Sequence, residues 1–219
     1  MRYVTNDIRR ATQDIDIDFI RYSLSEDSID QFIKELNCLD GIRIVRTGPI
    51  EELHQQNYKG KRIYITIRDE MNNQINSKID LGVHKHMNIN QQEYCFDVAF
   101  DKEGASLLIN TQEQMFTEKL KQLLKFGSFS TRYKDIYDMY YQCGKLDKDK
   151  FIQCFDVLIF SDNSMREKNI FDICKRIQYV FNDKSFKSRV NNSDKRWLDD
   201  DINKIFATIR HYLKTLSEK

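Results

Sequence analysis

The sequence predicts an α+β protein in which a mixed-sheet domain at residues 1–110 is followed by a helical domain at residues 111–219. Two observations support this fold class. Before residue 110, apolar side chains recur at every second position in several short runs, which is typical of half-buried strands. After residue 110, they recur at three- and four-residue spacings almost to the end of the chain, which is typical of packed helices.

The first half begins with a strand, continues with a helix and then contains further strands, which is an α/β order. Residues 14–20 alternate strictly between aspartate and apolar side chains, so one face of this strand is acidic. Ser25 is followed by two acidic residues and then by an apolar stripe, which marks the start of a helix. We expect the later strands at 42–46, 61–68, 75–84 and 94–99.

Five apolar stripes predict five helices in the second half of the chain. They cover residues 116–124, 136–143, 151–158, 170–181 and 202–216. The residues between the last two stripes, 182–194, are polar and rich in serine and asparagine, so we expect a mobile connection there.

The composition excludes several classes of protein. Lys and Arg total 35 against 34 Asp and Glu, so no global field attracts nucleic acid, and any such contact must come from a local patch. Five scattered cysteines without a C-x-x-C pair favour reduced thiols over a zinc site. No apolar run has the length of a membrane span and no signal peptide is recognisable, so we expect a cytoplasmic protein without membrane partners.

The most informative segment is the first strand, where Asp14 and Asp16 project from the same face. Two carboxylates this close repel each other unless a cation lies between them, and Mg²⁺ prefers oxygen ligands of this kind. An isolated pair is more often a solvated acidic face. Asp80 favours the metal site, because it lies mid-strand on the face opposite Ile79 and Leu81 and supplies a third carboxylate from a neighbouring strand.

Two motifs resemble a known family. The Thr-x-Asp-Ile-Asp run at residues 12–16, followed by a helix and a strand with one more aspartate, resembles the polymerase-beta nucleotidyltransferase superfamily. The fuller run at 7–19 is similar to the AbiEii/AbiGii toxin branch of that superfamily. The Glu-Lys-Leu at 118–120 and the R-x-K-D-x-x-D pattern within 131–140 are similar to a helical signature of the same branch. The resemblance covers residues 1–143.

This resemblance implies a Mg²⁺-dependent nucleotidyltransferase that transfers a nucleotidyl group from a nucleoside triphosphate to an RNA or protein acceptor. It also implies the toxin of a toxin–antitoxin or abortive-infection pair in phage defence, with a cognate antitoxin as partner. The metal ligands would be Asp14, Asp16 and Asp80, in a site that can hold two metal ions.

The helical signature supplies further candidate residues. By spacing alone, Arg132, Asp135 and Asp138 share one side of a helix, which favours a solvated face. The resemblance implies instead that a lysine contacts nucleotide phosphates and that an aspartate orients it or acts as a base. The catalytic candidates are Lys134, Asp135 and Asp138. The candidates for phosphate binding are Arg9, Arg10, Lys119 and Arg132, although surface ion pairing also explains Arg9 and Arg10.

Two alternative functions remain open. The family carries a Gly-Gly or Gly-Ser pair upstream of the acidic strand, whereas the first glycine here is Gly41. A truncated, inactive member that binds nucleotide or a protein partner explains this difference. The basic residues between 184 and 196, interleaved with Phe186 and Trp197, suggest an RNA-binding module that uses charge and stacking. Three aspartates at 199–201 offset part of this charge and favour a solvated connector.

Overall fold

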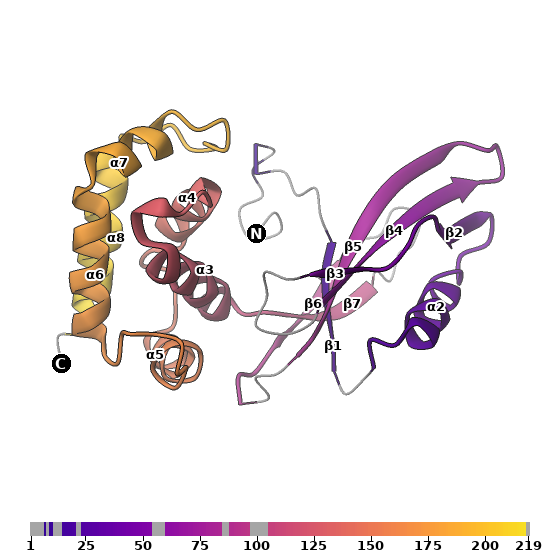
Figure 1. Ribbon diagram of the computed structural model, residues 1–219, viewed down its shortest axis with the longest axis horizontal. Coiled ribbons are helices and arrows are strands. Elements are labelled where there is room, and N and C mark those ends of the chain that lie inside the picture. Colours follow the sequence, from indigo (N-terminus) through magenta and orange to yellow (C-terminus); the bar gives the residue numbers. More distant parts are fainter. Residues whose placement is uncertain are drawn as a thin grey trace. The chain divides into compact units, whose positions relative to one another are not determined.

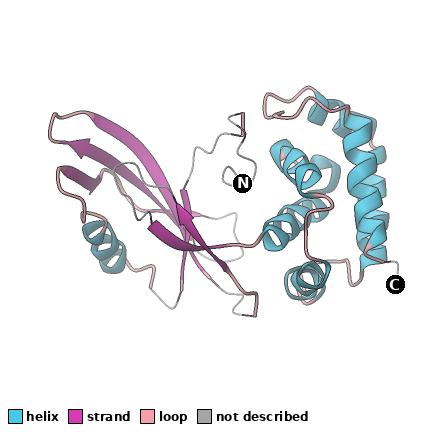
Figure 2. Cartoon of the chain, turned by 180° about the vertical axis from the view of Figure 1, so that it is seen from behind, coloured by secondary structure: helices cyan, strands magenta, loops and turns pink. Residues whose placement is uncertain are grey.

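The computed structural model describes residues 7, 9–10, 15–20, 23–53, 60–84, 88–96 and 105–217. The chain groups into two compact units (Figures 1 and 2). The sheet unit runs from Ala11 to Met87, and the helical unit comprises Asn88–Lys219 together with Tyr3–Arg10. The sheet unit is therefore inserted between two parts of the helical unit along the chain. The sequence had suggested a boundary at 110–111, more than twenty residues later.

The sheet unit contains one helix and a mixed sheet, as the sequence predicted. Its elements are β1 (Ile15–Phe19), α2 (Glu26–Glu35), β2 (Ile42–Arg46), β3 (Glu51–Leu53), β4 (Gly60–Asp69) and β5 (Gln74–Val83). The strand order is β1-β5-β4-β2, and β3 also pairs with β4. β1 runs parallel to β5, whereas the other pairs are antiparallel.

The two faces of this sheet differ in polarity because side chains alternate along each strand. The apolar face packs against α2 and forms a separate core, whose buried members are Ile29, Ile33, Ile63, Ile65, Ile79 and Leu81. The opposite face carries the polar residues of β1, β4 and β5. The strict alternation of the first strand thus turns its aspartates away from the core.

The helical unit begins with a two-stranded hairpin and continues with helices. Its elements are β6 (Gln92–Phe96), β7 (Ala105–Ile109), α3 (Gln112–Phe126), the 3₁₀ turn η1 (Gly127–Phe129), α4 (Tyr133–Gln142), α5 (Lys148–Phe155), the π-helical turn η2 (Asp156–Phe160), α6 (Ile170–Asn182), α7 (Lys184–Asn191) and α8 (Ile202–Thr215). A large core joins these helices, with the rings of Phe181 and Phe206 stacked at 4.0 Å between centroids.

The expectation of a mobile connection at 182–194 was wrong, because α7 occupies most of that segment. The side chain of Asp183 caps this helix by accepting a hydrogen bond from the Phe186 amide. Phe186 and Val190 are fully buried four residues apart, so two apolar anchors suffice to hold a short polar helix on the core.

All five cysteines are free thiols: Cys38, Cys95, Cys143, Cys154 and Cys174. Burial raises the pKa of the Cys143 and Cys154 thiols to about 12, which makes them poor nucleophiles. Within the described part of the chain, no helix combines the length and the apolar character that crossing a membrane requires.

Candidate functional site

Two aspartates meet on the polar face of the sheet. Asp16 of β1 is the register partner of Asp80 of β5, so the two carboxylates project from the same face of adjacent parallel strands. Adjacent strands lie about 4.8 Å apart. Asp16 is exposed, whereas the side chain of Asp80 is only 13% exposed. Asp14, the third predicted ligand, lies outside the described residues.

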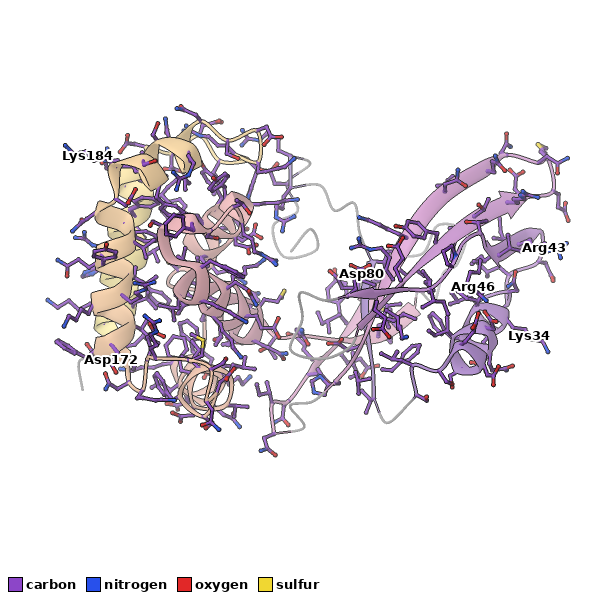
Figure 3. All side chains as sticks on the ribbon, in the orientation of Figure 1. Lys34, Arg43, Arg46, Asp80, Asp172 and Lys184 are labelled. Atoms are coloured by element: carbon purple, nitrogen blue, oxygen red, sulfur yellow. The ribbon has the colours of Figure 1, made fainter. Side chains whose placement is uncertain are left out.

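Arg62 of β4 holds Asp80 in place. Its guanidinium donates two hydrogen bonds, Nε to Oδ1 at 2.7 Å and Nη2 to Oδ2 at 2.8 Å. Each oxygen of an ionised carboxylate has two lone pairs, so this fork leaves Asp80 with an acceptor position on each oxygen. Figure 3 labels Asp80 on the sheet.

The chemistry of this pair fits a hard divalent cation. Carboxylate oxygens on adjacent strands are the donors that Mg²⁺ prefers, and a cation between them would offset their repulsion. Asp16 and Asp80 supply two donors. Among the described residues, no group of three or more acidic, histidine or cysteine side chains is placed to hold a metal. The described donor set is therefore a pair, with one carboxylate from β1 and one from β5.

A buried network of charges lies in the helical unit and is centred on Asp138 of α4, whose side chain has no exposed surface. Arg10 donates Nε to Oδ1 and Nη2 to Oδ2, both at 2.6 Å. Lys119 of α3 lies 3.0 Å from Oδ2, and the indole Nε1 of Trp197 donates to Oδ1 at 3.1 Å. One carboxylate therefore joins the N-terminal segment, α3 and the segment before α8.

Asp135 extends this network by one turn. Lys119 Nζ lies 3.0 Å from its Oδ1, and Arg132 Nε donates to its Oδ2 at 2.6 Å. Burial opposes ionisation of both Lys119 and Asp135, yet the opposite charges outweigh it: the pKa of Lys119 is raised and that of Asp135 is lowered. Lys119 is thus a protonated ammonium held between two carboxylates.

Lys134 differs from Lys119 in its surroundings. It is half-buried on α4, and burial lowers its pKa, with the positive charge of Arg10 acting in the same direction. Its amine therefore loses its proton at a lower pH than an ordinary lysine. The sequence suggested both lysines for phosphate contact. Lys119 is held between two aspartates, whereas the lowered pKa of Lys134 makes its ammonium easier to deprotonate.

The sequence-predicted residues of α4 and of the N-terminal segment differ in how deeply they are buried. Spacing alone had favoured a solvated face for Asp135 and Asp138, and this was wrong because both are buried. The surface-pair interpretation describes Arg9, which lies 2.7 Å from the exposed Asp199. Arg10 instead forms a buried pair. No local signal pointed to its partner, which is 128 positions away.

Trp197 is the residue of this network that sequence reasoning misassigned. It was considered with Phe186 as an aromatic group for stacking on RNA, but both side chains are buried, at 2% and 1% exposed. Arg196, from the same basic stretch, donates to the backbone carbonyls of Leu198, Asp199 and Asp200. The stretch therefore packs its aromatic residues inward and uses one of its cations to order the chain.

Comparison with protein families now adds to this geometry. The family model described as "Nucleotidyl transferase AbiEii toxin, Type IV TA system" matches residues 1–215, nearly the whole chain. The chain belongs to the AbiEii family. The resemblance found in the two motifs is thereby confirmed, and so is the α+β nucleotidyltransferase fold. A search of the curated proteins found no match to the chain.

Membership of the AbiEii family fixes the general class of the protein. The family consists of nucleotidyl transferase toxins of type IV toxin–antitoxin systems, which implies a nucleoside triphosphate as substrate and an antitoxin as partner. The two motifs that identified the AbiEii family fall in different units: the acidic strand in the sheet unit, and the helical signature in the buried network of the helical unit.

Proposed function

We propose that the chain is a Mg²⁺-dependent toxin that transfers a nucleotidyl group from a nucleoside triphosphate to an RNA or protein acceptor. The pairing of Asp16 with Asp80, on the polar face of a sheet in a chain of this family, carries the proposal. Nucleoside triphosphates are cytoplasmic metabolites, so the reaction belongs in the cytoplasm. Its toxicity would serve abortive infection in defence against phage.

In this proposal, Asp14, Asp16 and Asp80 hold the Mg²⁺, which when bound neutralises phosphate charge and orients the attacking and leaving oxygens. Arg62 fixes the carboxylate of Asp80 beforehand, so little side-chain freedom is lost when the site fills. Asp16 is the exposed member of the Asp16–Asp80 pair.

The helical signature supplies the supporting groups in this proposal. Lys134 contacts phosphate oxygens as a point charge. Burial lowers its pKa, and a bound phosphate would favour its protonated form. Asp135 and Asp138 orient Lys119 rather than remove a proton themselves, since their oxygens already accept from Lys119, Arg132, Arg10 and Trp197. Arg9 and Arg132 are the more exposed cations of the set and remain candidates for phosphate contact.

The test measures transfer of radioactive label from each of four α-labelled nucleoside triphosphates to total RNA and to total protein. Asp16→Asn and Asp80→Asn should each reduce transfer by about 100-fold or more, the cost of removing one preorganised charge. Asp18→Asn is the matched control: Asp18 lies on the same strand and face, but its partner on β5 is Gly82. We expect it to retain transfer within a few-fold. Wild-type rates in Asp16→Asn and Asp80→Asn would refute the proposed mechanism.

A second measurement identifies the donor. Calorimetric titration with ATP, GTP, CTP and UTP in the presence of Mg²⁺ should show binding of one triphosphate that is lost in Asp14→Ala/Asp16→Ala. Binding that persists without Mg²⁺ would contradict the role given to these aspartates.

A further inference from the structure

Two like-charged arginines of the sheet unit face each other across adjacent strands. Arg43 of β2 is the register partner of Arg68 of β4, and both are exposed. Like charges directly opposite each other on antiparallel strands are destabilising. The other two described arginines of this sheet each bind carboxylates: Arg46 binds Asp30 and Glu26, and Arg62 binds Asp80. No ion pair between described residues includes Arg43 or Arg68.

This arginine pair shares a face with the two aspartates. Along β4, Arg62 and Arg68 are an even number of residues apart, so their side chains project to the same side. The partner of Arg68 on β5 is Gln74, and the partner of Arg62 is Asp80. Arg43 and Arg46 are labelled in Figure 3; the first belongs to this polar face, and the second contacts α2.

Hydrogen-bonding side chains occupy the face between its two ends. On β5, three further side chains project to the same side as Asp80: Gln74, Asn76 and Lys78. Asn76 accepts a hydrogen bond from Thr66 of β4 at 2.7 Å. Tyr64 and Glu51 also lie on this face and are joined by a hydrogen bond. The face thus changes from cationic at the Arg43–Arg68 end to a mixed end, where Asp16, Glu51 and Asp80 outnumber Arg62.

The length of this face matches a stretch of polynucleotide. Arg68 and Arg62 are six positions apart along β4, which at 3.3–3.4 Å per residue is about 20 Å. Phosphates of one stacked strand are spaced about 3.4 Å apart along the axis, so the face spans roughly six of them.

We propose that this face binds the phosphates of a single-stranded polynucleotide acceptor, with Arg43 and Arg68 contacting phosphates roughly six positions from the end that lies at Asp16 and Asp80. Guanidinium groups bind phosphate oxygens through paired hydrogen bonds, and the bound phosphates offset the repulsion between the two arginines. The position of the reacting end rests on the proposed function. The binding of the strand by the arginines does not, and so it is measurable in the absence of transfer.

The test is binding of fluorescent oligoriboadenylates by the full-length chain at several salt concentrations. Strands of about 12 and about 3 residues distinguish a ligand that spans the face from one that does not. For the longer strand, Arg43→Gln/Arg68→Gln should lower the affinity at least fivefold. It should also lower the slope of log K against log salt by about 1.4, since each single-strand phosphate contact contributes about 0.7. Binding of the shorter strand should change less than twofold.

The matched control is Lys34→Gln/Lys150→Gln. It removes two exposed positive charges on α2 and α5, neither of which belongs to the polar face of the sheet. We expect it to bind the longer strand as the wild type does. Equal losses in both double variants, or wild-type binding that does not depend on strand length, would overturn the proposal. Thermal unfolding of Arg43→Gln/Arg68→Gln should occur at the wild-type temperature or slightly above it, because the substitution removes a repulsive pair.

The transfer assay separates this inference from the proposed function. Label transferred to protein but not to RNA would overturn the polynucleotide acceptor and leave the transferase activity intact. Absence of transfer to any acceptor would refute the proposed function, while loss of strand binding in Arg43→Gln/Arg68→Gln would still support the arginine surface.

Discussion

Asp138 shows how far a single residue can depart from its local pattern. Its position on α4 is typical of a solvated face, yet its carboxylate is fully buried and is bound by Arg10, Lys119 and Trp197. A buried carboxylate is tolerable only when its charge and its lone pairs are matched. Here two cations and an indole N–H provide that match, and they come from segments far apart in sequence.

Replacing Asp138 should therefore be costly. Asp138→Asn removes the buried negative charge that Arg10 and Lys119 share, so we expect the free energy of unfolding to fall by about 3–5 kcal/mol. Urea denaturation of the full chain measures this loss. Asp199→Asn is the control, because Asp199 pairs with Arg9 at the exposed surface, and its loss should cost less than about 1 kcal/mol. Similar losses in the two variants would contradict a buried hub.

For single residues, the sequence predicted that Asp16 and Asp80 share a face of the sheet, but it did not predict the buried network around Asp138. Strict alternation put Asp16 on the side opposite Ile15 and Ile17, and the same logic put Asp80 opposite Ile79 and Leu81. Both inferences need only the two-residue period of a strand. The ion pair between Arg10 and Asp138 depends instead on tertiary packing between residues 128 positions apart, which a local pattern of side chains cannot predict.

Among the elements, α3 is tied to the turn that follows η2 by one ion pair. Lys121 Nζ lies 2.6 Å from Asp162 Oδ2, and Asp162 Oδ1 accepts from the Ser164 amide at 2.7 Å. Burial opposes ionisation of Asp162, but hydrogen bonds from Lys121 and Ser164 hold the pKa of its carboxyl well below the ordinary 3.8. The pair thus links the end of the π-helical turn to the middle of α3.

This link predicts a dependence of stability on pH. Because the folded-state pKa of Asp162 is depressed, its contribution is fully present above about pH 4, where the unfolded chain is also ionised, and is lost as the pH falls further. Asp162→Asn should lower the free energy of unfolding by about 1–3 kcal/mol at pH 7 and by much less at pH 2. Unfolding measured across this range tests it. Lys121→Gln should flatten the same part of the curve, and a loss independent of pH in both variants would contradict the assignment.

The elements that the sequence missed are short or polar. β3 has three residues, and the five residues of β7, Ala-Ser-Leu-Leu-Ile, do not alternate between polar and apolar. The expected strand at 94–99 overlaps β6, Gln92–Phe96, and its residues 97–99 lie outside the described part of the chain. α7 has a polar sequence with two buried apolar side chains, Phe186 and Val190, too few to form a stripe over several turns. The long apolar stripes predicted helices correctly because each repeats an apolar position over several turns, as α8 does from Ile202 to Leu213.

For the molecule as a whole, the change of periodicity near residue 110 was a poor guide to the units. The strands β6 and β7 group with the helices, and Tyr3–Arg10 joins the same unit from the other end of the chain. Periodicity reports the type of element and not the core to which it belongs. The two cores, one around α2 and the sheet and one among α3–α8, are what define the units.

Because the two units have separate cores, loss of an ion pair should destabilise mainly the unit that contains it. Trp197 is the single tryptophan of the chain and is buried in the helical unit, so its fluorescence reports unfolding of that unit. Arg10→Gln should move the fluorescence transition to lower urea by the equivalent of about 3 kcal/mol, because it breaks a buried pair within the same unit. Arg46→Gln, which releases Asp30 and Glu26 in the sheet unit, should leave that transition unchanged.

Hydrogen exchange followed by mass spectrometry provides the complementary measurement. Arg46→Gln should accelerate exchange in α2 and β2, with a loss of at most about 1 kcal/mol because Asp30 and Glu26 are exposed. Arg10→Gln should accelerate exchange in α4 instead, although Arg10 lies only five residues before β1 in the sequence. If both variants accelerated exchange in both units to the same extent, the two cores would unfold as one, and the N-terminal segment would stabilise the whole chain rather than the helical unit.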